Sequence, residues 1–315
     1  MRTLFRVLLL WYAVWLVVGL GLAGYELFQG YSKYSKALFP TGHVEDLLFL
    51  ALAAALLGLW LGSALGAKKT WALFAWVAGG AGLVEWYGVQ HDLPFGEYQY
   101  TDHLGPSLPG GLPLAVPLAW WVVVVPVYLS AQTILDLIFA PRRTEPPTLE
   151  NNSSPAPSPW PDRLLAGTTA LGAVAMDLAL EPAAQVRHYW WWNSSGAWWY
   201  DVPTLNFFGW LLVSFILALG LQWIAGPLLR ERFHAGGPQL LLPLLLPATV
   251  LAPFWIDLAG QPLAHLWISL LLIGWLSQTM FWTRFLPTLW PRALWAGPPV
   301  GAPSTNPEMN RADKS

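Results

Sequence analysis

The sequence contains no cysteine among its 315 residues, and it carries little charge. The first absence excludes disulfide bonds, thiolate catalysis, iron–sulfur clusters and cysteine-ligated zinc within this chain. The second leaves a net charge of −2, which gives no reason to expect a nucleic-acid partner. Gly-rich phosphate loops, DDxxD prenyl-diphosphate motifs and histidines at metal-ligand spacings are missing as well. We therefore expect a protein that works without a cofactor or a metal.

Apolar sequence is what the chain has in abundance. Hydrophobic residues make up 55% of it, charged residues 11%, and the mean hydropathy is +0.45. Such a composition is typical of a membrane protein, because apolar segments of about 20 residues match the thickness of the bilayer hydrocarbon. We predict an all-α, polytopic integral membrane protein with about eight transmembrane helices, over residues 4–28, 47–66, 71–90, 112–140, 163–180, 205–225, 239–256 and 263–282. Three prolines interrupt the seventh stretch, and a re-entrant segment there would reduce the count to seven.

The basic residues fall almost entirely on one side of this predicted topology. With the N-terminus in the cytoplasm, 13 of the 16 Lys and Arg residues lie in cytoplasmic segments, and only Lys33, Lys36 and Arg187 lie outside. The positive-inside rule therefore places both termini in the cytoplasm, in a multi-pass protein of the cell membrane. No small-residue cleavage site follows the first stretch, so we interpret it as a retained span rather than a signal peptide.

Polar sequence rich in Pro and Ser divides the chain into parts. Residues 141–162 predict a cytoplasmic linker between two four-helix halves, and residues 296–315 predict a disordered cytoplasmic tail. Residues 1–295 would then form a single membrane domain that contains the linker.

A first cluster of polar and aromatic residues surrounds the outer end of the third stretch. Glu85 lies within the apolar segment itself, where a carboxyl is costly and indicates a functional site. In the following loop, Tyr98 and Tyr100 alternate, so an extended segment would project both rings to one face. Anchoring of the loop at the membrane interface explains these tyrosines equally well. The candidates for substrate contact in this cluster are His91, Phe95, Tyr98, Tyr100 and Asp102.

A second cluster surrounds the outer end of the fifth stretch. Asp177 and Glu181 are four residues apart, so they share one helix face, and Pro182 is expected to end that helix. Glu181 alone is also explained as a solvated acid at a helix end, and Asn206 as the N-cap of the sixth helix. The candidates for substrate contact in this cluster are Trp190, Trp192, Asn206 and Trp210.

Acids in an aromatic surrounding, without a metal, nucleotide or nucleophile, favour one class of chemistry. A protonated carboxylic acid can protonate an alkene, and burial of a carboxyl favours its protonated form. Aromatic faces stabilise the resulting carbocation, and a second carboxylate positions the water that captures it. The two clusters together contain each of these groups.

Several motifs recur in a fixed order within residues 45–285. They are Glu85-x-x-Gly88, Pro94-Phe95-Gly96-x-Tyr98-x-Tyr100, Leu104-Gly105-Pro106, Pro117-x-x-Trp120, Asp177-Leu-Ala-Leu-Glu181-Pro182, Trp190-x-Trp192, Tyr200-x-Val-Pro203 and Asn206-Phe-x-Gly209-Trp210. With these motifs the chain resembles the carotenoid biosynthesis membrane family that contains the carotenoid 1,2-hydratases, including the bisanhydrobacterioruberin hydratases. It departs from the family pattern at His91-Asp92, where a Thr-Gly pair is common, and at Glu181, where Asp is common.

The resemblance implies cofactor-independent addition of water across the terminal C1–C2 double bond of an acyclic (ψ) carotenoid end group. Lycopene- or γ-carotene-type polyenes would be substrates, entering laterally from the membrane lipid, and other carotenoid-pathway enzymes would be partners. We assign Asp177 as proton donor and Glu85 as the group that orients water or accepts its proton, with the reverse assignment open and Glu181 as a third catalytic acid. The alternatives are a carotenoid end-group isomerase or cyclase, and a non-catalytic carotenoid-binding or lipid-transport protein.

Overall fold

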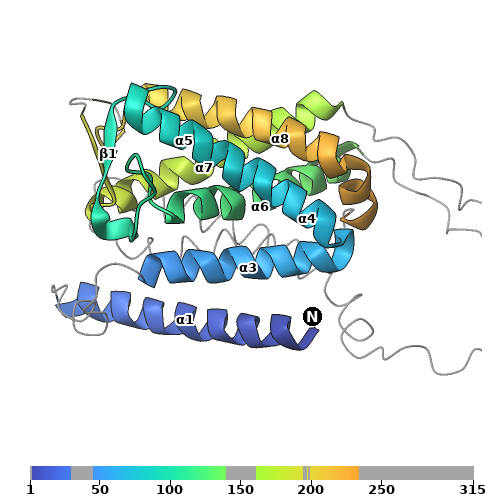
Figure 1. Cartoon of the computed structure of the whole chain (residues 1–315), viewed down its shortest axis with the longest axis horizontal. Helices are drawn as coiled ribbons and strands as arrows, with labels where there is room; N and C mark the ends of the chain where they lie inside the picture. The colour runs from blue at the N-terminus through green and yellow to red at the C-terminus, as the bar shows by residue number, and fades with distance from the viewer. Residues whose placement is uncertain (1, 30–44, 140–160, 194–196, 198, 234–315) are drawn as a thin grey trace, which may run out of the picture. The chain divides into compact units, whose positions relative to one another are not determined.

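The computed structural model describes residues 2–29, 45–139, 161–193, 197 and 199–233. Within these residues the chain is mostly helical (Figure 1). Five helical segments are long and apolar enough to cross a membrane: Asp46–Leu65, Ala67–His91, Ala115–Asp136, Asp162–Gln185 and Thr204–Arg232. The described residues therefore have the all-α, membrane-protein character that the sequence predicts.

The helices follow the predicted apolar stretches. The first stretch is α1 (Arg2–Gln29) and the second is α3 (Glu45–Leu65). The third stretch combines α4 (Ala67–Phe74), a π-helical segment η1 (Ala75–Gly79) and α5 (Gly80–His91). A π-helical insertion of this kind shifts the faces of the two flanking helical segments relative to each other.

The fourth, fifth and sixth stretches form α6 (Ala115–Phe139), α7 (Asp162–Val186) and α8 (Thr204–Arg232). The seventh and eighth stretches, nearly all of the 141–162 linker and the 296–315 tail lie outside the described residues. The number of spans, their orientation in the membrane and the division into domains therefore stay predictions.

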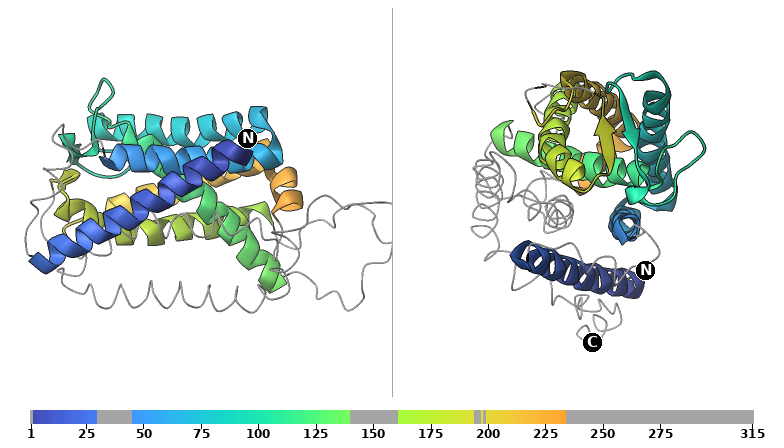
Figure 2. Two further views of the ribbon diagram at one scale, coloured as in Figure 1. Left: turned by 90° about the horizontal axis from the view of Figure 1, so that it is seen from below. Right: turned by 90° about the vertical axis from the view of Figure 1, so that its left-hand side faces the viewer.

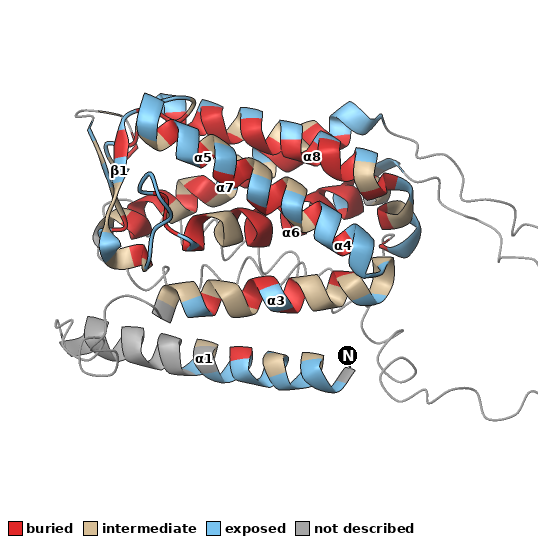
Figure 3. Ribbon diagram, in the orientation of Figure 1, coloured by how far each residue is buried: buried red, intermediate tan, exposed pale blue. Residues whose placement is uncertain are grey.

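Helix α6 lies at the centre of the described helices. Of its membrane-spanning window 72% is buried, more than in any of the other four segments. It packs against α3 on one side and α7 on another, while α7 packs along α8. The end-on view in Figure 2 shows these helices side by side, and Figure 3 shows the buried residues concentrated on α6, α7 and α8. Trp120 and Trp121, both on α6, are the largest fully buried side chains.

Helix α7 continues past Pro182, contrary to the expectation that this proline ends it. Proline lacks the N–H that would bond the carbonyl of Leu178, four residues earlier. The indole Nε1 of Trp199 donates to that carbonyl at 3.1 Å and so replaces the missing bond. The helix therefore reaches Val186, and Glu181 stays on the same helical face as Asp177.

The loops at one end of the helices form a small antiparallel sheet of two strands, β1 (Tyr98–Tyr100) and β2 (Trp190–Trp192). The register pairs Tyr98 with Trp192 and Tyr100 with Trp190. A 3₁₀ turn, η2 (Asp102–Leu104), follows β1. The sheet joins the loop after α5 to the loop after α7, and thus connects segments that lie far apart in the sequence.

Basic residues gather at the opposite end of these helices. Lys69, at the start of α4, donates to the carbonyl of Ile224 on α8, and Arg230 pairs with Asp162. This separation of charge from the sheet agrees with the pattern on which the predicted orientation rests.

Candidate active site

The sheet presents one aromatic face to the helices. Side chains alternate along a strand, so the tyrosines of β1 and the outer tryptophans of β2 share a face. Gln99 and Trp191, between them, lie on the other face and are exposed. The alternation of Tyr98 and Tyr100 thus does what the sequence predicts, since an extended segment brings both rings to the same side.

Glu85, on α5, accepts hydrogen bonds from three side chains. The hydroxyl of Tyr98 donates to its Oε2 at 2.6 Å and that of Tyr100 at 3.0 Å. The indole of Trp120 donates to its Oε1 at 2.9 Å. Glu85 is 5% exposed. A glycine at position 88 makes the first contact feasible, because a Cβ there would lie 3.0 Å from the Tyr98 hydroxyl oxygen.

Glu181, on α7, is bound in a similar way by the other strand. The indoles of Trp190 and Trp192 both donate to its Oε2, at 3.0 and 2.9 Å. The amide of Asn206, on α8, donates to its Oε1 at 3.0 Å. Glu181 is 2% exposed, so it is not the solvated helix-end acid that its position in the sequence also allowed.

Asp177 lies one helical turn before Glu181 and has fewer partners. The same Asn206 amide donates to its Oδ2 at 2.8 Å. Its Oδ1 has no hydrogen-bond partner among the described residues, although the side chain is only 1% exposed. Asn206 thus bridges the two acids of α7, which is a larger role than the N-cap that its position suggested.

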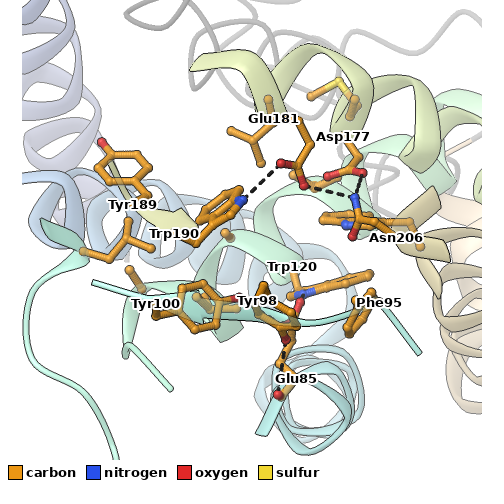
Figure 4. A pocket seen from close by; sticks show the side chains of 18 of the residues that line it. Glu85, Phe95, Tyr98, Tyr100, Trp120, Asp177, Glu181, Tyr189, Trp190 and Asn206 are labelled. Carbon is orange, nitrogen blue, oxygen red and sulfur yellow. Dashed lines mark hydrogen bonds between the residues drawn. The ribbon is translucent and has the colours of Figure 1, made fainter. Parts of the chain in front are cut away.

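These three acids line one pocket with an empty volume of about 920 Å³, its open side included. Figure 4 shows Glu85 on the side of the pocket opposite Asp177 and Glu181, with the rings of the sheet between them. The other lining residues are Leu50, Phe95, Tyr98, Tyr100, Leu104, Ala115, Val116, Ala119, Trp120, Val123, Met176, Leu180, Tyr189, Trp190, Trp192, Asn206 and Trp210. The lining is largely apolar and aromatic with a few convergent polar groups, which is the character of a small-molecule site.

Aromatic rings form a continuous wall in this pocket. Trp120 and Trp210 stack with ring centroids 3.9 Å apart, and Phe95 lies 6.2 Å from Trp120. Close packing of the loop against α8 holds Phe95 in place. A Cβ at Gly209 would lie 2.6 Å from the Phe95 ring, so this position has room only for glycine.

The tyrosines of the pocket remain neutral hydrogen-bond donors. Burial, with a further contribution from Glu85, raises the pKa of Tyr98 and the pKa of Tyr100 well above the usual value for tyrosine. Burial also raises the pKa of Tyr189, whose hydroxyl contacts Asp46 at 2.5 Å and receives a bond from Arg187 at 3.2 Å. That contact ties the start of β2 to α3.

The structure brings together ten of the twelve residues predicted for the site. The two others lie outside the pocket lining. His91 is exposed at the end of α5, where its ring lies 4.3 Å from that of Tyr87, and the side chain of Asp102 is 92% exposed. His91 and Tyr87 are four residues apart on α5 and share its exposed face, so His91 points away from the pocket.

Two pocket-lining residues with hydrogen-bonding side chains, Trp120 and Tyr189, were not predicted for the site. Trp120 lies in one of the recognised motifs, but an aromatic residue in an apolar helix needs no functional explanation. Tyr189 adjoins the predicted Trp190, and only the pairing of the strands reveals its contact with α3. Among the described residues, no group of three or more His, Cys, Asp or Glu side chains is arranged to hold a metal ion.

Comparisons with known proteins show the family of the chain. A family model described as "Carotenoid biosynthesis protein" matches residues 45–276. The chain is also similar to the bisanhydrobacterioruberin hydratase of Haloarcula japonica, with 29% identity over 136 residues. That match covers 43% of this chain and 39% of the relative, so the chain spans about two fifths of the length of the relative it matches. No solved structure matches it. Because the family model covers most of the sequence, including all three acids, the chain belongs to the carotenoid biosynthesis protein family.

Proposed function

We propose that this protein is a carotenoid hydratase, which adds water across the terminal C1–C2 double bond of an acyclic (ψ) end group. Membership of the family and the name of the matched relative support a carotenoid as the substrate. The observation that carries the proposal is the arrangement of three buried acids around one aromatic pocket, where Asp177 alone has a carboxyl oxygen without a partner among the described residues.

Asp177 is the proton donor in this proposal. An ionised carboxylate is an acceptor only, and the three donors on Glu85 and on Glu181 match that form. Asp177 receives one donor, which leaves its other oxygen able to carry a proton toward the pocket. Transfer of that proton to C2 of the end group breaks the double bond and leaves a tertiary cation at C1.

The pocket stabilises the cation in two ways. The faces of Trp120 and Trp210 present π-electron density to a positive charge. The carboxylates of Glu85 and Glu181 add negative charge in a surrounding from which most water is excluded, so their effect is stronger than it would be in bulk solvent.

Water captures the cation at C1, and Glu85 receives the proton that the water loses. The proton then returns through solvent to Asp177, so that one alkene and one water give one tertiary alcohol with no other reactant. The regiochemistry follows from the stability of the tertiary cation. Lycopene- or γ-carotene-type polyenes fit the proposal, since a long polyene within the membrane can present its end group to a pocket at the end of these spans.

Expression in a lycopene-producing host tests the proposal by pigment analysis. The wild-type protein should yield a carotenoid whose mass has increased by one water, and Asp177→Asn and Glu85→Gln should abolish or strongly reduce this product. Matched controls are Asp92→Asn and Glu97→Gln, which change exposed acids of the neighbouring loop. An end-group isomer or cyclised product of unchanged mass would refute hydration, as would pigment that is bound but unaltered. Full yield from both site variants would refute the assigned roles.

A further inference from the structure

The pocket has an apolar wall in addition to its polar side. Six aliphatic residues form this wall: Leu50 on α3, Val116, Ala119 and Val123 on α6, and Met176 and Leu180 on α7. None of these side chains can donate or accept a hydrogen bond of ordinary strength, so they have no place in the proton chemistry. They are called the aliphatic wall below.

Helix α6 contributes three of the six residues of the aliphatic wall. Val116, Ala119 and Val123 recur at spacings of three and four residues, so they form one stripe along the helix. At 1.5 Å per residue this stripe is about 10 Å long. It runs from the end of α6 that adjoins the sheet toward the middle of the helix, which means away from the loops and into the apolar span.

Helices α3 and α7 provide the two sides. Each of them packs against α6, and among the described residues they make few contacts with each other. Leu50 on α3 and Leu180 on α7 line the same pocket as this stripe. Ala119 has the smallest side chain of the stripe and lies at its centre, between two valines.

We propose that the aliphatic wall is the subsite for the isoprenoid chain that adjoins the reacting end group. This inference rests on the proposed function and extends it to how the substrate is held. A methyl-branched polyene carries no hydrogen-bonding groups, and burying it against aliphatic side chains is favourable in proportion to the area covered. Ala119 has the smallest side chain of the α6 stripe and therefore sets the clearance above this helix.

The aliphatic wall adjoins the carboxyls of α7, and this position indicates which ligand binds there. Met176 and Leu180 alternate with Asp177 and Glu181 along the inner face of α7, so an apolar chain on the wall ends beside both carboxyls. A lipid acyl chain has similar solubility, but it has no branched terminal alkene to offer these acids.

Filling the stripe is the direct test. Ala119→Leu adds bulk at the centre of the wall, and overpacking of this kind should weaken binding of lycopene by about tenfold or more. Met176→Phe adds bulk to the aliphatic wall on α7, and it replaces Ala119→Leu as the test if that variant does not fold. The matched control is Ala175→Leu, because Ala175 is exposed on α7 next to Met176 and is not part of the pocket.

Binding is measured by lycopene quenching of tryptophan fluorescence in purified protein, and hydration by pigment analysis in cells. We expect Ala119→Leu and Met176→Phe to lose both, while Ala175→Leu keeps both and Asp177→Asn keeps binding alone. Wild-type affinity in a folded Ala119→Leu variant would overturn the subsite, as would an equal loss in the Ala175→Leu control. If no variant or wild-type protein hydrates lycopene but the binding pattern holds, the hydratase proposal fails and the subsite stands.

Discussion

Removal of the Tyr98 hydroxyl tests whether the hydrogen bonds on Glu85 support the reaction. The hydroxyl donates to Glu85 Oε2 at 2.6 Å, the shortest of the three bonds on that carboxyl. In Tyr98→Phe the ring remains, with its centroid 5.2 Å from Trp192 and 6.3 Å from Phe95. The substitution therefore removes one donor and leaves the packing of the loop intact.

The magnitude follows from the charge on the acceptor. A hydrogen bond to a charged group contributes about 1.5–3 kcal/mol, about twice the contribution of a neutral bond. Glu85 must be ionised to accept the proton of water in the proposed mechanism, and loss of a donor favours its protonated, inactive form. The active fraction, and with it the hydration rate, should fall by up to roughly 10- to 150-fold, since 1.4 kcal/mol corresponds to about a factor of ten. Tyr100→Phe should have a smaller effect, because its bond to the same oxygen is longer, at 3.0 Å.

The assay is the initial rate of lycopene hydration in membranes, with thermal unfolding of each variant in detergent measured beside it. Gln99→Ala is the control, because Gln99 lies between the two tyrosines on the opposite, exposed face of β1. A folded Tyr98→Phe variant with the wild-type rate would contradict the role given to Glu85. A similar loss in Gln99→Ala would show that the strand, rather than the hydroxyl, is what the reaction needs.

Two further predictions concern stability. The Leu178 carbonyl has no helical partner because Pro182 lacks an N–H, and Trp199→Phe removes the indole donor that replaces it. This substitution should lower the free energy of unfolding by about 1–3 kcal/mol, measured as a lower melting temperature in detergent. Alkaline pH should also destabilise the fold. The tyrosines of β1 have raised pKa values in the folded protein and stay protonated there, whereas the same tyrosines in the unfolded chain ionise near pH 10. Their stabilising contribution is therefore complete below about pH 10 and declines above it, by up to about 1.4 kcal/mol per pH unit for each tyrosine; a melting temperature that is constant from pH 9 to 12 would contradict this.

The sequence predicted those parts of the site that depend on local spacing. Asp177 and Glu181 share a helix face because they are four residues apart, and Tyr98 and Tyr100 share a strand face because they are two apart. The position of Glu85 within an apolar span also predicts a site from local sequence alone, because a carboxyl there needs hydrogen-bond partners in any fold.

The parts that the sequence did not predict depend on contacts between distant segments. The pairing of β1 with β2 joins loops about 90 residues apart, and three tryptophans in succession have no alternation from which a strand could be predicted. The continuation of α7 past Pro182 depends on Trp199, which lies in the following loop. His91 adjoins the loop in the sequence, but it lies on the exposed face of α5 beside Tyr87 and so does not reach the pocket.

The pattern of donors explains why one acid differs from the other two. Each strand supplies donors to an acid on the helix that precedes it in the chain: β1 to Glu85 on α5, and β2 to Glu181 on α7. Each loop can therefore satisfy its own carboxylate, and the pairing of the strands then places both beside one pocket. Asp177 lies a turn deeper than the strands reach, and it shares only the Asn206 amide with Glu181. A carboxyl with a single donor has an oxygen free to carry a proton, and the proposed mechanism uses this difference by taking Glu85 and Glu181 as carboxylates and Asp177 as the proton donor.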